Sequence, residues 1–265
     1  MIDDTLAQVF STQWRVLFIV ALLLLGFTEL GHRVGLRLHH AKDEPRRGQI
    51  GSVQGAVLGL LGLLLGFTFA MAVGRFNHRR DLVLQEANAI GTTYLRAALL
   101  PPAHRGAVED LLRRYVGVRI DFYGSGTDAS KRDEAERTTA RLQRELWAHA
   151  VAAAQEAPTP ITATFINALN DTIDLDAARL NALRTRVPGA VWLLVLVVAA
   201  AGCYASGYGA GATGARSAFA NLLLPVLVTV VVTLISDLDR PRQGLISISQ
   251  QPLRDLQSSL GVPER

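Results

Sequence analysis

The chain has 265 residues, of which 49% are hydrophobic, and its mean hydropathy of +0.24 is high for a water-soluble protein. The formal net charge of +4 would suit nucleic acid. However, the basic residues cluster at the edges of apolar stretches, as lipid-anchoring residues do, and no nucleic-acid-binding module accompanies them. A single cysteine, Cys203, excludes a disulfide or a thiolate metal site within one chain.

Four apolar stretches are long enough to cross a bilayer, whose hydrocarbon core of about 30 Å requires roughly 20 helical residues. The first follows Asp3 and Asp4 rather than a basic start, so we expect a retained anchor and not a cleaved signal. The glycine-rich stretch 207–216 predicts a tight turn between the last two. The expected membrane helices span about 14–38, 52–74, 189–206 and 218–236.

A long polar insert separates the second and third apolar stretches. Helical spacing of its first apolar residues predicts that the second helix continues to the prolines at 101 and 102. Prolines and the turn GSGTDAS divide the rest into three more helices, and no strand pattern occurs. The predicted fold is an all-α integral membrane protein with an N-terminal helix pair (1–74), a helical insert (75–187), a C-terminal pair (188–236) and a polar tail (237–265).

The number of crossings and the basic residues together predict an orientation. Four crossings put both termini and the insert on the same side. Lysines and arginines near the ends of the crossings are more numerous on that side, which favours the cytoplasm. We therefore expect a multi-pass protein of the bacterial inner membrane with a cytoplasmic insert and cytoplasmic termini.

A line of small residues follows one face of the second membrane helix. Glycine costs about 1 kcal/mol relative to alanine in a helix interior, so this line needs a compensating gain. In lipid, small residues allow two helix backbones to approach closely. The seam could lie within one subunit, or the helix could pack against its own copies in a ring. The line consists of Gly55, Gly59, Gly62, Gly66 and Gly74, with Ala70 between the last two.

In a ring, another edge of this helix would face the axis. Phe67, Phe69 or Met71 could then form an apolar constriction, and such constrictions can gate ions by excluding water. The sequence does not decide which of the three faces inward.

Charged residues in or near the membrane helices have two interpretations each. Glu29 could line a pathway or carry a proton, or it could pair with Arg33 one helical turn away. A second cluster could ring a pore mouth and select ions by charge, or could form salt bridges that fix the tail. Its members are Arg75, Arg79, Arg80, Asp237, Asp239, Arg240 and Arg242.

No arrangement of residues indicates catalysis, a metal site or a cofactor. Asp171, Asp174 and Asp176 lack the ligand pattern of a calcium loop, and we expect them to pair with Arg179 and Arg96. Residues 209–214 match a dinucleotide fingerprint in letters only, because that fingerprint requires a strand before it. No nucleophile accompanies a plausible His–Asp pair, so we do not expect an enzyme.

Four segments resemble the bacterial "bestrophin-like" membrane proteins, a family of unknown function that is distantly similar to bestrophins. The resemblance implies the layout of bestrophins, which are pentameric, anion-selective channels with four membrane helices, cytoplasmic termini and a large helical region between the second and third helices. No acidic run like the bestrophin calcium clasp occurs, so calcium gating does not transfer. The segments are GFTFAMAVGRFNHRR (66–80), EANAIGTTYLR (86–96), INALNDTIDLDAARLNALRTRVP (166–188) and SDLDRPRQGLISISQQPLRDL (236–256).

The leading hypothesis from the sequence is an oligomeric membrane ion channel or pore, anion-conducting by resemblance, with an axis lined by the second membrane helix. Its expected partners are the lipid bilayer, inorganic ions and its own copies, which the resemblance implies to be five in number. The alternative is a non-conducting membrane scaffold or sensor whose insert binds a cytoplasmic partner. A closed ring with an axial hole would favour the channel.

Overall fold

The computed structural model describes residues 2–38, 44–126, 128–214, 218–240 and 246–261. Within these ranges every regular element is a helix and no strand occurs, so the all-α prediction is confirmed. The helices are α1 (Ile2–Arg37), α2 (Glu44–Ala97), α3 (Pro102–Gly124), α4 (Ala129–Glu156), α5 (Pro160–Arg184), α6 (Gly189–Thr213), α7 (Ala218–Asp239) and α8 (Gln251–Ser259).

The helix boundaries of the insert follow from prolines and capping residues. Proline occupies the first turn of both α3 and α5, where its missing N–H costs nothing. The Asp128 carboxylate accepts hydrogen bonds from the Ser130 and Lys131 amides at the start of α4. Thr159 caps α5 in the same way, by accepting from the Thr162 amide. The prolines and polar residues of the sequence therefore place these breaks close to where the structure has them.

The expected turn at 207–216 is wrong for most of its length. Helix α6 continues to Thr213 and ends on Gly214, whose φ of +68° is the left-handed conformation that glycine adopts easily. The glycines at 207, 209 and 211 are thus helical. Gly207 and Gly211 pack closely against α1, whereas a Cβ on Gly209 would meet the Gln54 and Ile50 side chains of α2.

Four segments are long and apolar enough to cross a membrane: Trp14–Arg37, Gly48–Ala97, Pro160–Thr213 and Asn221–Asp239. They contain α1, α2, α6 and α7, so the four predicted crossings are confirmed by length and composition. The third segment also includes α5, which a short non-helical stretch after Arg184 separates from α6.

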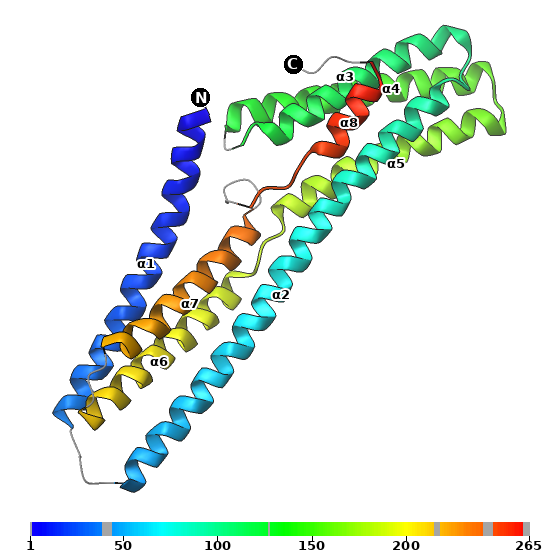
Figure 1. Cartoon of the computed structure of the whole chain (residues 1–265). Coiled ribbons are helices and arrows are strands. Elements are labelled where there is room, and N and C mark those ends of the chain that lie inside the picture. Colours follow the sequence, from blue (N-terminus) through cyan, green and yellow to red (C-terminus); the bar gives the residue numbers. More distant parts are fainter. Residues whose placement is uncertain (1, 39–43, 127, 215–217, 241–245, 262–265) are drawn as a thin grey trace. The chain divides into compact units, whose positions relative to one another are not determined.

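The chain forms two compact units. Unit 1 comprises Met1–Arg75 and Arg186–Ile246 and contains α1, α6, α7 and the first part of α2. Within it α1 packs against both α6 and α7 (Figure 1). The core of this unit is built mainly from small and branched side chains, including Leu24, Leu61, Val195, Ala199, Cys203, Val228 and Val232.

Unit 2 comprises Phe76–Thr185 and Ser247–Arg265. The last part of α2 packs here with α3, α4, α5 and α8 around larger side chains. The tail that the sequence analysis treated as one region is therefore divided, since 237–246 belong to unit 1 and α8 belongs to unit 2. The buried core of unit 2 includes Ile90, Leu112, Tyr115, Leu142, Leu146, Phe165, Leu169 and Leu253.

Candidate functional site

Helix α2 packs within unit 1 through one leucine-rich side. Leu61 and Ala72 are buried on this side. A Cβ added to Gly202 of α6 would stand 3.3 Å from the Leu58 side chain and 3.7 Å from that of Leu61. Leucine side chains, not glycines, therefore fill the space between α2 and α6.

The glycine line of α2 is uncovered by the part of the chain that the structure describes. Apart from the neighbouring backbone of α2 itself, no described atom lies within 4 Å of the position that a Cβ would take at any of its glycines. The interpretation of this line as a seam within one subunit is therefore wrong. Packing against another copy of the chain stays a prediction. The residues concerned are Gly55, Gly59, Gly62, Gly66 and Gly74.

The close backbone seam of unit 1 lies instead between α1 and α6. A Cβ on Gly31 would stand 2.1 Å from the Tyr204 carbonyl oxygen, and one on Gly35 would stand 2.4 Å from that of Tyr208. From the other side, a Cβ on Gly207 would stand 2.0 Å from the Thr28 carbonyl oxygen. No side chain fits at these distances, so glycine is required there. Within the single chain, the rule that small residues allow close helix approach in membranes therefore applies to α1 and α6 rather than to α2.

The three constriction candidates do not share one side of α2. Phe67, Phe69 and Met71 have exposed fractions of 64%, 40% and 39% in the single chain. At about 100° per residue, Phe67 and Met71 lie roughly 40° apart, whereas Phe69 lies about 200° from Phe67. Leu60 is exposed and lies within about 20° of Phe67, so Leu60, Phe67 and Met71 form one bulky stripe. We call these three residues the bulky stripe of α2.

The acidic residues after α7 are buried and hold nearby backbone. The Asp239 carboxylate accepts from the Val187 amide at 3.0 and 3.2 Å and lies 3.7 Å from Arg75 Nη1. Asp237 accepts from the Ile246 amide at 2.9 Å. Both carboxylates are buried in the single chain. This geometry fits the salt-bridge interpretation better than a ring of charges facing a pore.

The described basic members of the same cluster have different surroundings. Buried Arg79 donates to the carbonyl oxygens of Ala182 and Thr185 at 3.0 and 2.7 Å. Arg80 is exposed and lies 3.7 Å from Asp81. Arg240 is half-buried, and Arg242 lies outside the described residues. Arg79 thus holds backbone carbonyl groups of unit 2, where the sequence left open a selectivity role or a salt bridge to the tail.

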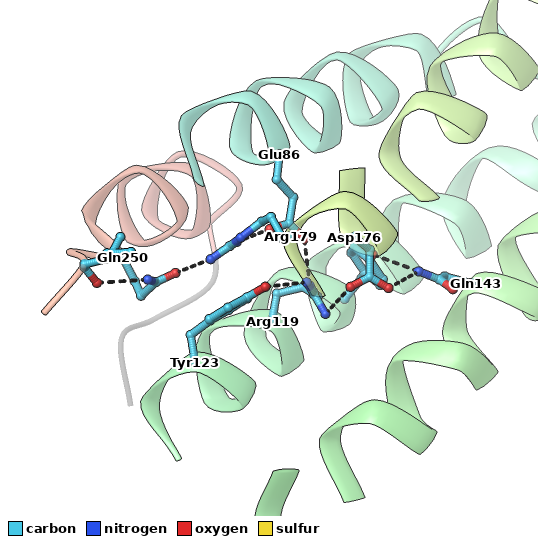
Figure 2. A network of polar contacts seen from close by, with 9 residues as sticks. Glu86, Arg119, Tyr123, Gln143, Asp176, Arg179 and Gln250 are labelled. Carbon is cyan, nitrogen blue, oxygen red and sulfur yellow. Dashed lines mark hydrogen bonds and ion pairs between the residues drawn. The ribbon is translucent and has the colours of Figure 1, made fainter. Parts of the chain in front are cut away.

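Unit 2 contains a buried ionic network centred on Glu86, which Figure 2 shows. Glu86 is fully buried, and its Oε1 accepts from Arg119 Nε at 2.7 Å. Its Oε2 pairs with Arg179 Nη1. Arg119 also binds Asp176 at 2.5 Å, through Nη1. Two buried arginines therefore face two carboxylates, and the charges balance.

Neutral polar groups complete this network. Gln143 Nε2 donates to Asp176 Oδ2 at 2.8 Å and to the Tyr115 hydroxyl at 3.1 Å. Arg179 Nη2 donates to Gln250 Oε1 at 2.8 Å, and Arg179 Cζ lies 3.6 Å from the centre of the Tyr123 ring. The network joins α2, α3, α4, α5 and the residue before α8 (Figure 2). It thereby ties the C-terminal segment to the core of unit 2.

Burial raises the pKa of some members of this network. It raises the pKa of the Asp176 carboxyl, and the neighbouring Arg119 only partly opposes it. It also raises the pKa of Tyr115, so this hydroxyl stays protonated at every physiological pH. Breaking one partner of such a pair leaves an unpaired buried charge, which typically costs about 3–5 kcal/mol.

The sequence analysis assigned different partners to these residues. It expected Asp171, Asp174 and Asp176 to pair with Arg179 and Arg96. Instead Asp176 pairs with Arg119, while Asp174 accepts from the Asn170 amide group. Arg96 donates to the Thr164 carbonyl oxygen at 2.8 Å. A usable signal was Glu86 itself, which falls at helical spacing with the apolar Val83 and Ile90 and so belongs to a buried face.

Among the described residues, no group of three or more His, Cys, Asp or Glu side chains is arranged to hold a metal ion. The remaining intramembrane candidate, Glu29, accepts from Arg33 Nε at 2.7 Å, and both side chains are substantially exposed in the single chain. This contact matches the pairing that the sequence offered as the alternative to a pathway role.

The model of the Bestrophin-like domain matches residues 13–253 of the chain. The chain belongs to the Bestrophin-like family. No match was found among curated proteins. Solved structures show the same fold. A crystal structure of a bacterial bestrophin homolog from Klebsiella pneumoniae, phased with zinc, gives a TM-score of 0.63 at 16% identity over 92% of this chain and 99% of that one.

Other structures agree with this match. A variant of the Klebsiella pneumoniae homolog with a tyrosine-to-alanine substitution gives a TM-score of 0.62 at 15% identity, covering 92% of this chain and 97% of that one. A structure described as a membrane protein with a glycine-to-alanine substitution gives 0.63 at 14% identity over 94% and 98%. The Bestrophin-like chain is therefore a membrane protein with the fold of bacterial bestrophin homologs.

Proposed function

We propose that this Bestrophin-like protein is an oligomeric, anion-conducting channel of the bacterial inner membrane, and that it is not an enzyme. The observation that carries the proposal is the uncovered face of α2. No other described part of the chain covers its glycine line, and the bulky stripe beside it is exposed. Family membership supports a ring, since bestrophins are pentameric channels with the layout that the sequence predicts.

In this proposal the two uncovered stripes of α2 have separate roles. The glycine line packs against α2 of the neighbouring subunit, because the absence of side chains allows close backbone approach in lipid. The bulky stripe then faces the axis and forms the constriction. A narrow ring of Leu60, Phe67 and Met71 would resist wetting and so limit ion flow. The insert and both termini would lie in the cytoplasm.

Reconstituted flux tests the proposal. Liposomes containing the purified protein should release chloride faster than empty liposomes, and faster than they release potassium. Phe67→Ala should raise this flux several-fold because it removes bulk from the constriction. Phe69→Ala is the matched control, since Phe69 is the same residue type on another side of the helix and should leave flux near the wild-type value.

Particle images and native mass spectrometry supply the second test. A closed ring with an axial hole is expected. A dimer without a hole, combined with no measurable flux of any inorganic ion, would overturn the channel and favour the scaffold or sensor that the sequence left open.

A further inference from the structure

A cavity of about 860 Å³ opens in unit 2 among α3, α4 and α8. Its volume lies within the range of about 300–1,000 Å³ that small-molecule sites occupy. The cavity has no part in the proposed conduction path, because none of its lining residues belongs to a candidate membrane helix. A role for it must therefore be argued from its own chemistry.

Four arginines from three helices line this cavity. Arg113 and Arg114 come from α3, Arg141 from α4 and Arg254 from α8. Asp121 is the single carboxylate among the described residues that line the cavity. Guanidinium groups present paired donors that match the oxygens of phosphate and carboxylate, so this lining suits a ligand with several negative charges.

The chain neutralises these arginines only in part. Arg114 Nη2 and Arg141 Nη1 approach the same carboxylate, that of Glu145, at 3.8 and 3.4 Å. Two positive charges on different helices therefore share one negative charge. Their side chains are 58% and 54% exposed, so both can turn toward a ligand.

The other two arginines differ in how firmly they are held. Arg113 is fixed by Asp110 at 2.7 Å and by the Leu260 carbonyl oxygen at 3.2 Å. Arg254 is exposed and makes no ion pair within the part of the chain that the structure describes. Positive charge is thus in surplus around Arg114, Arg141 and Arg254.

The remaining lining residues suit a larger and less charged part of a ligand. Val118, Ile120 and Leu142 supply apolar surface, and Gln251 and Gln257 supply amide groups. A second cavity of about 530 Å³ adjoins the first, since both are lined by Val118, Ile120, Asp121 and Thr138. The arginines lie in the first cavity alone, so a ligand would place its charged end there and extend toward the second.

We propose that this cavity binds a phosphate-bearing ligand, whose phosphate oxygens are held by Arg114, Arg141 and Arg254. Phosphate fits better than a single carboxylate because three guanidinium groups from three helices converge on one space, and a phosphoryl group offers three equivalent acceptor oxygens. The proposal goes beyond conduction and does not depend on it. The ligand could be free in solution, as a nucleotide is, or could be a lipid headgroup, and the test separates these sources.

Direct binding to the purified full-length protein tests the site. Calorimetric titration with ADP and with inorganic pyrophosphate should show one class of site per chain, with an affinity that falls as salt rises. Arg254→Gln should weaken binding by about tenfold or more, which is the usual range for a hydrogen bond to a charged group. Its thermal unfolding should match the wild type, because the Arg254 side chain makes no ion pair in the described chain.

Arg137→Gln is the matched control, because Arg137 is an exposed arginine of α4 that lines neither cavity. It should bind both probes like the wild type. The second arm uses a short-chain phosphatidic acid below its micelle concentration. Arg254-dependent binding of ADP or pyrophosphate supports a free ligand, and Arg254-dependent binding of phosphatidic acid alone supports a lipid headgroup. If no probe binds in a manner that depends on Arg254, or if Arg137→Gln weakens binding equally, the proposal is wrong.

Discussion

Two series of helical glycines in this chain look alike in sequence and behave in opposite ways. In the α1–α6 seam, Gly31, Gly35, Gly207 and Gly211 each lie where an added Cβ would come within 2.4 Å of a backbone oxygen of the opposite helix. Along α2, a Cβ added at any glycine from Gly55 to Gly74 would have no described atom of another helix within 4 Å. The first series completes the fold of the single chain, and the second leaves a surface that the chain itself does not cover.

The difference shows that a small-residue pattern predicts close approach without naming the partner. Glycine is costly in a helix interior, so both series need a compensating contact. For α1 and α6 that contact is visible, and the two helices run parallel because the contacting positions advance together along both. For α2 the contact must come from outside the chain. This contrast separates substitutions that break the fold from substitutions that break only assembly.

The largest effect on folding is expected at the α1–α6 seam. Gly31→Ala places a methyl group 2.1 Å from the Tyr204 carbonyl oxygen. The atoms that it meets are α6 backbone, which cannot move aside as a flexible side chain can. We expect loss of a monodisperse, folded protein in detergent, measured by size-exclusion chromatography and thermal unfolding. Gly26→Ala in the same helix is the control, because nothing lies within 4 Å of its added Cβ. It should be neutral or slightly stabilising, and equal damage by both variants would contradict the seam.

The next effect belongs to the buried network of unit 2. Glu86→Gln leaves Arg119 and Arg179 without their shared charged partner, which should lower the free energy of unfolding by about 3–5 kcal/mol. Thermal unfolding with a probe in unit 2 measures this. A loss below about 1 kcal/mol would show that water or rearranged side chains replace the pairing.

Asp176→Asn is the matched carboxyl-to-amide control in the same network. It should cost less than Glu86→Gln, because Asp176 is partly exposed and burial already raises the pKa of its carboxyl in the folded protein. A raised pKa means that the folded chain binds this proton before the unfolded chain does. The contribution of Asp176 to stability therefore rises as the pH falls toward its ordinary pKa of 3.8, and Asp176→Asn should remove this rise.

Much of the fold was predictable because it depends on local pattern. Apolar length predicted the four crossings, and the prolines with the turn GSGTDAS predicted the breaks in the insert, where the structure adds the caps Asp128 and Thr159. The end of α6 was not predictable from local rules. Glycines at 207–211 favour a turn in isolation, but they are helical in a segment where Gly207 and Gly211 pack against the α1 backbone and Gly209 lies against α2 side chains.

The residue pairs of the candidate sites were less predictable, because they too depend on packing between distant segments. The partners of Glu86 lie 33 and 93 residues away, and a choice among several arginines depends on how α3 and α5 pack. Arg79 is a second residue whose partners could not be read from its neighbours in the sequence. Its place in a basic run suggested a role at a pore mouth or a salt bridge to the tail, but it donates to the carbonyl oxygens of Ala182 and Thr185.

Substitutions in the glycine line of α2 are expected to affect the folding of the single chain less. Gly66→Leu adds bulk where nothing of the chain lies within 4 Å, so the subunit should still fold. Because the proposed α2–α2 approach requires bare backbone, the ring should dissociate into smaller species, measured by native mass spectrometry. Gly26→Leu controls for the gain in helix propensity and should keep the ring. An intact ring in Gly66→Leu would show that the glycine line does not face a neighbouring subunit.

The smallest effect is expected at the one exposed ion pair considered for a pathway role. Glu29 and Arg33 are one helical turn apart, and their contact of 2.7 Å joins two side chains that are 45% and 69% exposed. Pairs of this kind contribute about 0.3–0.5 kcal/mol, so Glu29→Gln should leave the unfolding temperature nearly unchanged. Arg33→Gln should behave the same way. Flux in liposomes tests whether Glu29 has a role in conduction. If this carboxylate carries protons or lines the path, flux in Glu29→Gln should differ from the wild type and should depend differently on pH. Equal flux in Glu29→Gln, Arg33→Gln and the wild type would assign both residues to anchoring α1, and would leave the bulky stripe of α2 as the part of the membrane region that limits ion flow.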